Sequence, residues 1–299
     1  MLGTTAKRIL LSVHILLNSI WIGGLAAMLF LTFASERVES GQQLYGANLT
    51  VFLIHDAVVM NVGIGVIVTS LLFSLFTKWG FFDFYWVIVK WIGLLVMFGV
   101  ITFLLSPAVN GMVALSDLEG IRALDNPTYL QYQRETTLYG SILLLLLLAV
   151  ICVSVFKPWG PRKRQFGTSR RTVLLSGVGS GFVIIGVLAF QFAQLQEYRN
   201  MLIENVNFEK IPDGTYIGAA DLGFEFRVAV SIKNHLVSDF RVLENYSSVY
   251  AKLAEGVAKK VLNEQSLNVR AVTGATTTSK CLLKAAENAL VEVQTMQER

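Results

Sequence analysis

The sequence Thr-Gly-Ala-Thr-Thr-Thr-Ser at residues 273–279 is the most specific signal in the chain and decides the fold of its C-terminal part. Gly274 and Ala275 carry little side-chain bulk, so the backbone can turn tightly and a bulky group can approach it. A helix is expected to begin at Thr278 or Ser279, because apolar residues recur at helical spacing in the segment that follows. An anion there would face unpaired backbone N–H groups and the positive end of the helix dipole. A Thr-rich helix cap without a ligand is the alternative interpretation.

This stretch resembles the flavin-attachment motif of the FMN-binding domain family, which has the pattern [Ser/Thr/Asp]-Gly-Ala-[Thr/Ser]-x-[Thr/Ser]. The family includes the FMN-carrying subunits of the sodium-pumping NADH:quinone reductase and of its ferredoxin-dependent relative. In those proteins a separate flavin transferase esterifies the last Thr of the motif with the FMN phosphate. The resemblance therefore implies covalent FMN, held as a phosphoester on Thr278. It also implies that the cofactor-binding residues are Thr273, Gly274, Ala275, Thr276, Thr277 and Ser279.

The residues before the motif predict the rest of a small α+β domain. Residues 213–218 resemble the opening strand of the same family, and residues 224–232 alternate as a half-buried strand does. A turn at 233–235, a strand at 236–243 and an amphipathic helix at 249–262 follow. The resemblance covers residues 212–293. It departs from the family at Arg270, where Asp is common, and at Thr273, where Ser is common.

The rest of the chain has the composition of a membrane protein. Hydrophobic residues make up 54% of the chain and charged residues only 15%. Several apolar runs are long enough to cross about 30 Å of hydrocarbon. The first run is too long for a cleaved signal peptide, and no small-residue cleavage site follows it. We expect five transmembrane helices, at residues 9–33, 51–76, 84–106, 138–156 and 173–192.

The basic residues predict the orientation of these spans. With a cytoplasmic N-terminus, the inner segments hold Lys7, Arg8, Lys78, Lys157, Arg162, Lys163, Arg164, Arg170 and Arg171. The outer segments hold only Arg37, Arg122 and Arg134. This asymmetry follows the positive-inside rule, and five crossings then place the C-terminal domain outside the cytosol. Because the net charge of +4 is accounted for by the inner collar, we expect no nucleic-acid partner.

The predicted fold is thus an α-helical membrane bundle followed by an extracytosolic α+β FMN-binding domain. Its first four helices resemble a family of small bacterial four-helix membrane proteins, through His14 with Trp-Ile-Gly-Gly at 21–24 and Trp-Val-Ile-Val-Lys-Trp at 86–91. This predicts a multi-pass protein of the bacterial cell membrane. The expected parts are a four-helix transmembrane domain at 1–156, a basic cytoplasmic linker at 157–171, a fifth transmembrane helix at 172–193, a connector at 194–211 and the FMN-binding domain at 212–299.

Polar residues inside the predicted spans are candidate functional groups, because burying them in lipid is costly. His55 and Asp56 lie near the outer end of span two and could hydrogen-bond a quinone headgroup. The alternative is a helix-end pair satisfied by water or by a loop at 107–136. His14, Asn18 and Lys90 could bridge spans one and three, with Lys90 snorkelling inward. A haem held by both His14 and His55 is disfavoured, because their depths differ by more than about 10 Å.

These features predict a membrane-bound flavoprotein electron carrier. Cys152 and Cys281 are the only cysteines, so the chain cannot ligate an iron–sulfur cluster by itself. A membrane quinol is the expected electron donor, and an extracytosolic protein or molecule is the expected acceptor. The alternative is a flavin-bearing sensor or assembly subunit of a larger redox complex, whose membrane bundle is only an anchor. Expected partners are membrane lipid, a flavin transferase, quinone and a redox partner protein.

Overall fold

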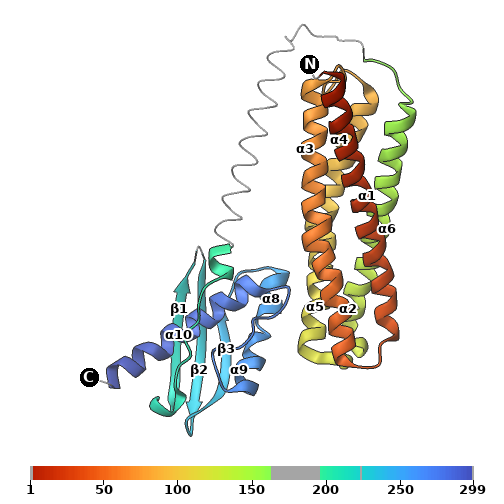
Figure 1. Ribbon diagram of the computed structural model, residues 1–299. Helices are drawn as coiled ribbons and strands as arrows, with labels where there is room; N and C mark the ends of the chain where they lie inside the picture. The colour runs from red at the N-terminus through yellow and green to blue at the C-terminus, as the bar shows by residue number, and fades with distance from the viewer. Residues whose placement is uncertain (1–2, 163–195, 223, 298–299) are drawn as a thin grey trace. The chain divides into compact units, whose positions relative to one another are not determined.

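A computed structural model of the chain describes residues 3–162, 196–222 and 224–297 (Figure 1). The chain divides into two compact units, Met1–Phe182 and Val183–Arg299. Four helical segments of the first unit are long and apolar enough to cross a membrane. The predicted fifth span, 173–192, and the linker beyond residue 162 lie outside the described residues. The structure therefore supports four of the five predicted spans.

The four spans are longer than predicted and two of them contain π-helices. The first span is α1 (Thr4–Ala34), followed by the 3-10 helix η1 (Ser35–Arg37). The second joins α2 (Gly41–Leu53), the π-helix η2 (Ile54–Met60) and α3 (Asn61–Phe76). The third joins α4 (Tyr85–Val100), the π-helix η3 (Ile101–Leu105) and α5 (Ser106–Glu119). The 3-10 helix η4 (Gly120–Asp125) then leads to the fourth, α6 (Pro127–Phe156).

The predicted loop at 107–136 is wrong, because this stretch is helical in α5, η4 and the start of α6. The second span alone, Gly41–Phe76, would be about 54 Å long at 1.5 Å per residue, well beyond a hydrocarbon layer of about 30 Å. A second apolar cluster explains why the helices continue. It consists of the fully buried residues Leu44, Met112, Ala123 and Tyr129.

Short-range contacts fix the helix ends opposite the N-terminus. The Ser40 hydroxyl accepts from the Gln43 backbone N–H at 3.3 Å and caps α2. The Asn126 side chain accepts from the Thr128 backbone N–H at 2.9 Å and caps α6. A Cβ placed on Gly41 would lie 2.9 Å from the Gly120 Cα, and Gly120 itself has a φ of +59°. Glycine is thus required where the α1–α2 connection meets the end of α5.

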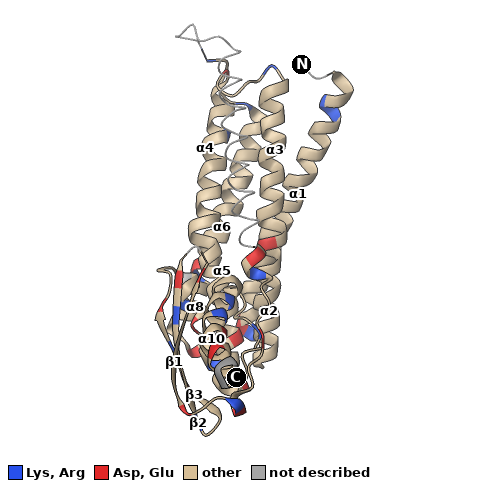
Figure 2. Cartoon of the chain, turned by 90° about the vertical axis from the view of Figure 1, so that its left-hand side faces the viewer, with Lys and Arg blue, Asp and Glu red and all other residues tan. Residues whose placement is uncertain are grey.

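The larger of the two apolar clusters forms the main core of the bundle, and the outside of the bundle is also apolar. Trp21, Leu25, Val59, Met97 and Leu143 are among the residues that pack in the core. The outer surface carries large exposed apolar side chains, including Phe30 (72% exposed), Phe103 (74%) and Phe156 (78%). Figure 2 shows the helices of this unit mostly free of charged residues. A surface of this kind suits lipid and not water, which agrees with membrane association.

The second unit contains the predicted three-stranded antiparallel sheet. Its strands are β1 (Gly214–Asp221), β2 (Glu225–Lys233) and β3 (Leu236–Glu244), in the order β1-β2-β3. Asn234 and His235 both have positive φ in the predicted turn. The predicted helix at 249–262 is instead two helices, α8 (Val249–Ala254) and α9 (Val257–Glu264). Gly256 lies at the break between them, where glycine weakens a continuous helix.

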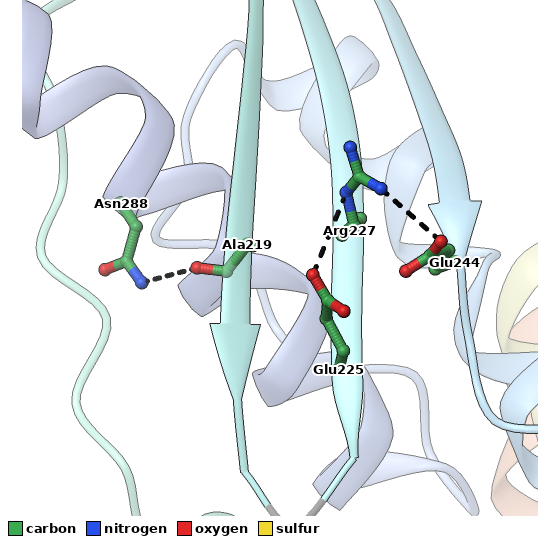
Figure 3. Close-up of polar contacts among 5 residues, drawn as sticks. All are labelled: Ala219, Glu225, Arg227, Glu244 and Asn288. Atoms are coloured by element: carbon green, nitrogen blue, oxygen red, sulfur yellow. Dashed lines mark hydrogen bonds and ion pairs between the residues drawn. The ribbon is translucent and has the colours of Figure 1, made fainter.

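The helix α10 (Thr276–Gln297) packs directly on β1 and β2. A Cβ on Gly218 of β1 would lie only 2.1 Å from the backbone oxygen of Ala285, so only glycine permits this approach. The Asn288 side chain donates to the Ala219 backbone oxygen at 2.9 Å (Figure 3). Arg227 on β2 forms ion pairs with the carboxylates of Glu225 and Glu244, at nitrogen–oxygen distances of 4.0 and 3.4 Å (Figure 3). The sheet therefore fixes the position of α10 and of the motif that precedes it.

The segment before the sheet also belongs to this unit's core. Val206, Phe208 and Ile211 are buried, and the 3-10 helix η5 (Phe208–Lys210) precedes β1. The Glu204 backbone N–H donates to the Glu287 carboxylate of α10 at 3.1 Å. Part of the segment that was predicted as a connector, 194–211, therefore belongs to the C-terminal domain.

Candidate flavin-attachment site

The motif forms a tight turn at the start of α10. Gly274 has a φ of +83°, a conformation that side chains with a Cβ rarely adopt. The Ala275 backbone N–H donates to the Val272 backbone oxygen at 3.0 Å, which closes the turn. Ala275 is buried at only 4% exposure, so its methyl group is packed and a larger side chain would not fit without movement. Gly274 is therefore required by its backbone conformation, and Ala275 by the small space around its side chain.

The helix begins at Thr276, earlier than the predicted start at Thr278 or Ser279. The Ser279 backbone N–H donates to the Ala275 oxygen at 3.0 Å, which is the first helical hydrogen bond of this turn. The backbone N–H groups of Thr276, Thr277 and Thr278 precede that bond and belong to the helix N-terminus. All three side chains are partly exposed. The motif thus presents three hydroxyls at a position that favours an anion.

Ser279 differs from the three threonines before it. Its side chain is fully buried, and its hydroxyl oxygen accepts from the Val272 backbone N–H at 3.2 Å. This bond joins the first turn of α10 to the segment before the motif. Ser279 therefore holds the turn in shape, while the accessible hydroxyls are those of Thr276, Thr277 and Thr278.

Arg270 adds positive charge at the opening of the motif. Its guanidinium Nη2 donates to the Thr273 hydroxyl at 3.2 Å. A guanidinium is a good partner for phosphate oxygens, and a helix N-terminus adds partial positive charge. The residues present thus fit a phosphate group. The departure at Arg270 from the family pattern increases the positive charge here.

Cys281 follows one turn into α10 but is not a competing nucleophile. It is buried at 2% exposure. Burial raises the pKa of its thiol from 9.0 to about 11, so the group stays protonated near neutral pH. Among the described residues at this helix start, the threonine hydroxyls are therefore the available attachment atoms.

The structure gives the membrane candidates His55 and Asp56 different environments. Both lie in the π-helix η2, a type of segment that is frequent at functional sites. His55 is buried at 3% exposure, and its Nε2 lies 3.0 Å from the Ser106 hydroxyl, directly after the π-helix η3. Asp56 is exposed on the bundle surface. Nδ1 of His55 is buried without a hydrogen-bond partner among the described residues.

Two polar residues near His55, Ser106 and Thr136, were not identified as candidates from the sequence. Asn48 donates to the Tyr129 hydroxyl at 3.0 Å, and both helices run in the same direction from there. His55 and Thr136 are each seven residues further on, so they lie at a similar depth. The Thr136 hydroxyl is also buried without a partner among the described residues. Ser106 and Thr136 are polar positions next to long apolar runs, and that was the available signal.

His14 does not bridge spans one and three with Lys90, as predicted, but contacts span two. Its Nδ1 lies 2.7 Å from the Thr69 hydroxyl of α3, while Asn18 donates to the His14 backbone oxygen on α1. Lys90 lies over the ring of Trp86 on its own helix. Thr69 is 14 residues beyond His55 along the second span, or about 21 Å. One haem cannot be ligated by both histidines over that distance.

Comparison with protein-family models matches residues 222–291 to the FMN-binding domain. The match covers β2, β3, the three helices and the attachment motif, but not β1 or the bundle. No curated protein and no solved structure matches the chain. The match supports FMN as the cofactor and indicates a flavoprotein with a role in electron transfer. The C-terminal unit of this chain therefore contains an FMN-binding domain, at residues 222–291.

Proposed function

We propose that this protein is a membrane-bound electron carrier with FMN attached to Thr278 through a phosphoester. The observation that carries this proposal is the position of Thr278. It lies in the first turn of α10, partly exposed, behind the left-handed turn at Gly274 and within the matched FMN-binding domain. Bound FMN would supply chemistry that accepts two electrons together and releases them one at a time.

The protein residues at this site would bind and orient the phosphate. The backbone N–H groups of the first helical turn and the Arg270 guanidinium supply hydrogen-bond donors and positive charge. Ser279 and Gly274 keep the turn rigid. Because the threonine hydroxyls are at the surface of the unit, a separate flavin transferase can reach them. The last Thr of the motif is the proposed attachment residue, with Thr276 and Thr277 as neighbours.

We further propose that the C-terminal unit is extracytosolic. The bundle end that holds the N-terminus carries Lys7, Arg8, Lys78, Lys157 and Arg162, and the opposite end carries Arg37, Arg122 and Arg134. This asymmetry supports a cytoplasmic N-terminus, and a fifth crossing at 173–192 supports an external C-terminus. Reporter fusions after Lys163 and after Arg299 should give cytoplasmic and external signals, respectively. A cytoplasmic signal after Arg299 would contradict this topology.

The proposed donor is a membrane quinol that binds near His55 and Asp56. His55 and Ser106 join the two π-helices in the bundle interior, and Asp56 lies at the same level on the surface. An imidazole and a carboxylate there could accept the two hydroxyl protons of a quinol. Electrons would then pass to the flavin domain and to an extracytosolic acceptor.

Quinol-dependent reduction of the flavin tests this role. Purified flavinylated protein should be reduced by a short-chain quinol, and His55→Ala and Asp56→Asn should slow that reduction while leaving flavin attachment intact. Gln42→Ala, at an exposed position on the same span 14 residues before Asp56, is a matched control. If both variants react at the native rate, the pair is structural and the bundle is an anchor, as in a sensor or assembly subunit. If quinol does not reduce the unmodified protein, another donor supplies the electrons.

A further inference from the structure

A cavity of about 470 Å³ lies between α1, α3, α4 and α6, in the half of the bundle that holds the N-terminus. Its volume is within the range of small-molecule sites. Apolar side chains such as Val66, Leu94, Met97 and Leu147 line its deeper part. His14, Lys90 and Lys157 line the part nearer the helix ends. The cavity is therefore amphipathic, with a long apolar section and a polar, positively charged section.

The positive section consists of ammonium groups held against two indole rings. Lys90 Nζ lies 5.7 Å from the centroid of the Trp86 ring, and Lys157 Nζ lies 5.9 Å from the same centroid. Lys157 Nζ also lies 5.8 Å from the Trp79 ring, and Lys7, which does not line the cavity, lies 4.7 Å from that ring. No lining residue in the described part of the chain is acidic. Two lysine ammonium groups with no acidic neighbour in the lining make this section favourable for an anion.

His14 adds a hydrogen-bond acceptor to the cavity. The Thr69 hydroxyl lies 2.9 Å from the Gly65 backbone oxygen and donates its proton within its own helix. With that proton used in the helix, we assign the 2.7 Å contact with His14 Nδ1 as a bond that the Thr69 hydroxyl oxygen accepts. The neutral His14 ring then carries its lone pair on Nε2, which has no partner among the described residues. A ligand with a hydroxyl group can donate to that atom.

We propose that this cavity binds one anionic glycerophospholipid with a hydroxylated headgroup. Its phosphate would lie near Lys90 and Lys157, its headgroup hydroxyl would donate to His14 Nε2, and one acyl chain would lie along Val66, Leu94 and Leu147. A neutral quinone fits less well, because it leaves the clustered ammonium groups without an anion. The depth supports a lipid, since Lys90 is five residues, or about 8 Å, inside the first residue of α4. This site is independent of the flavin proposal.

Binding of short-chain lipids to the full chain in detergent tests the proposal. Native mass spectrometry should show dioctanoyl phosphatidylglycerol binding at least about tenfold more tightly than dioctanoyl phosphatidylcholine. Dioctanoyl phosphatidic acid, which lacks the glycerol hydroxyls, should bind with intermediate affinity. Inorganic phosphate should compete weakly, because it cannot use the apolar section. Equal binding of the glycerol and choline lipids would overturn the proposal, as would phosphate competing as well as the lipid.

Variants locate the site. Lys90→Met combined with Lys157→Gln should weaken phosphatidylglycerol binding at least about tenfold, and Lys90→Arg should retain it. His14→Leu should remove the preference for phosphatidylglycerol over phosphatidic acid. Lys78→Gln, at an exposed lysine outside the cavity, is the matched control and should leave phosphatidylglycerol binding unchanged.

Unchanged binding in the double variant, or displacement of the lipid by decylubiquinol, would assign the cavity to another ligand. The lipid comparison on unmodified protein holds even if a variant does not fold.

Discussion

In the helical bundle, side-chain polar atoms of Trp21, His55, Thr102, Gln133 and Thr136 are buried without a hydrogen-bond partner in the described protein. The described part of the C-terminal unit contains no such atom. A buried polar group without a partner costs about 1–3 kcal/mol, so the bundle retains groups that work against its own packing. In the described part of the C-terminal unit, the buried side-chain polar atoms have hydrogen-bond partners, and the candidate threonine hydroxyls are partly exposed. The comparison favours membrane chemistry inside the bundle, and it leaves the candidate threonine hydroxyls where the proposed flavin transferase could reach them.

Replacing Gly218 should destabilise the C-terminal unit more than any other change considered for the two units. The Cβ of Gly218→Ala would lie 2.1 Å from the Ala285 oxygen and 2.6 Å from the Ala289 Cβ, so α10 must move off β1. We expect a loss of about 3 kcal/mol and early proteolysis of this unit. Gly99→Ala is the matched control in the bundle, because a Cβ there meets no atom within 4 Å. Equal melting temperatures for the two variants would show that α10 does not pack on β1 in this way.

Alkaline pH should weaken the C-terminal unit through Cys281. Burial raises the pKa of this thiol from 9.0 to about 11, so the folded state holds the proton more tightly than the unfolded state. The stabilisation is fully present below pH 9 and is lost as pH rises to 11, by about 2 kcal/mol. Thermal unfolding of the full chain across this range checks it, with Cys281→Ala as the control. An identical pH dependence for the two proteins would contradict the raised pKa.

The bundle end opposite the N-terminus should depend on one buried hydrogen-bonded pair, Asn48 with Tyr129. In Tyr129→Phe, the Asn48 side chain loses the hydroxyl that lies 3.0 Å away, in a site where Tyr129 is fully buried. We expect a loss of about 1–2 kcal/mol in unfolding free energy. Tyr85→Phe, at a residue that is 50% exposed, should have no effect in the same denaturation measurement. A neutral Tyr129→Phe would mean that Asn48 finds another partner.

The surface ion pairs of the sheet should contribute least. Arg227 contacts Glu225 and Glu244 at 4.0 and 3.4 Å, but all three side chains are at least 40% exposed. Solvent screens such pairs, so Arg227→Gln should change the unfolding free energy by less than about 0.5 kcal/mol. A loss above about 1 kcal/mol, removed by high salt, would show a stronger network than the distances indicate.

The sequence predicted the helices and strands of the C-terminal unit more completely than those of the bundle. The second and third strands, the turn at Asn234 and His235, and the presence of a helix after the motif followed from local patterns, and the structure confirms them. The first strand was expected from the family resemblance, and the helix begins earlier than its pattern predicted. Apolar runs predicted four of the bundle spans but not their length. The helix parts at the end opposite the N-terminus are more polar, and they are stabilised by contacts between distant residues such as Asn48 and Tyr129. The π-helices, and the contact between His55 and Ser106, depend on packing across helices and have no local signature.

Covalent attachment at Thr278 is the central claim, and peptide mass measurement tests it directly. The full chain, co-expressed with a flavin transferase, should yield a peptide containing residues 273–279 with the added mass of FMN joined through its phosphate. Thr276→Ala and Thr277→Ala should retain the added mass, and Thr278→Ala should lose it entirely. A flavin-bearing peptide from Thr278→Ala protein, or no covalent flavin on the unmodified chain in the presence of an active transferase, would contradict the claim.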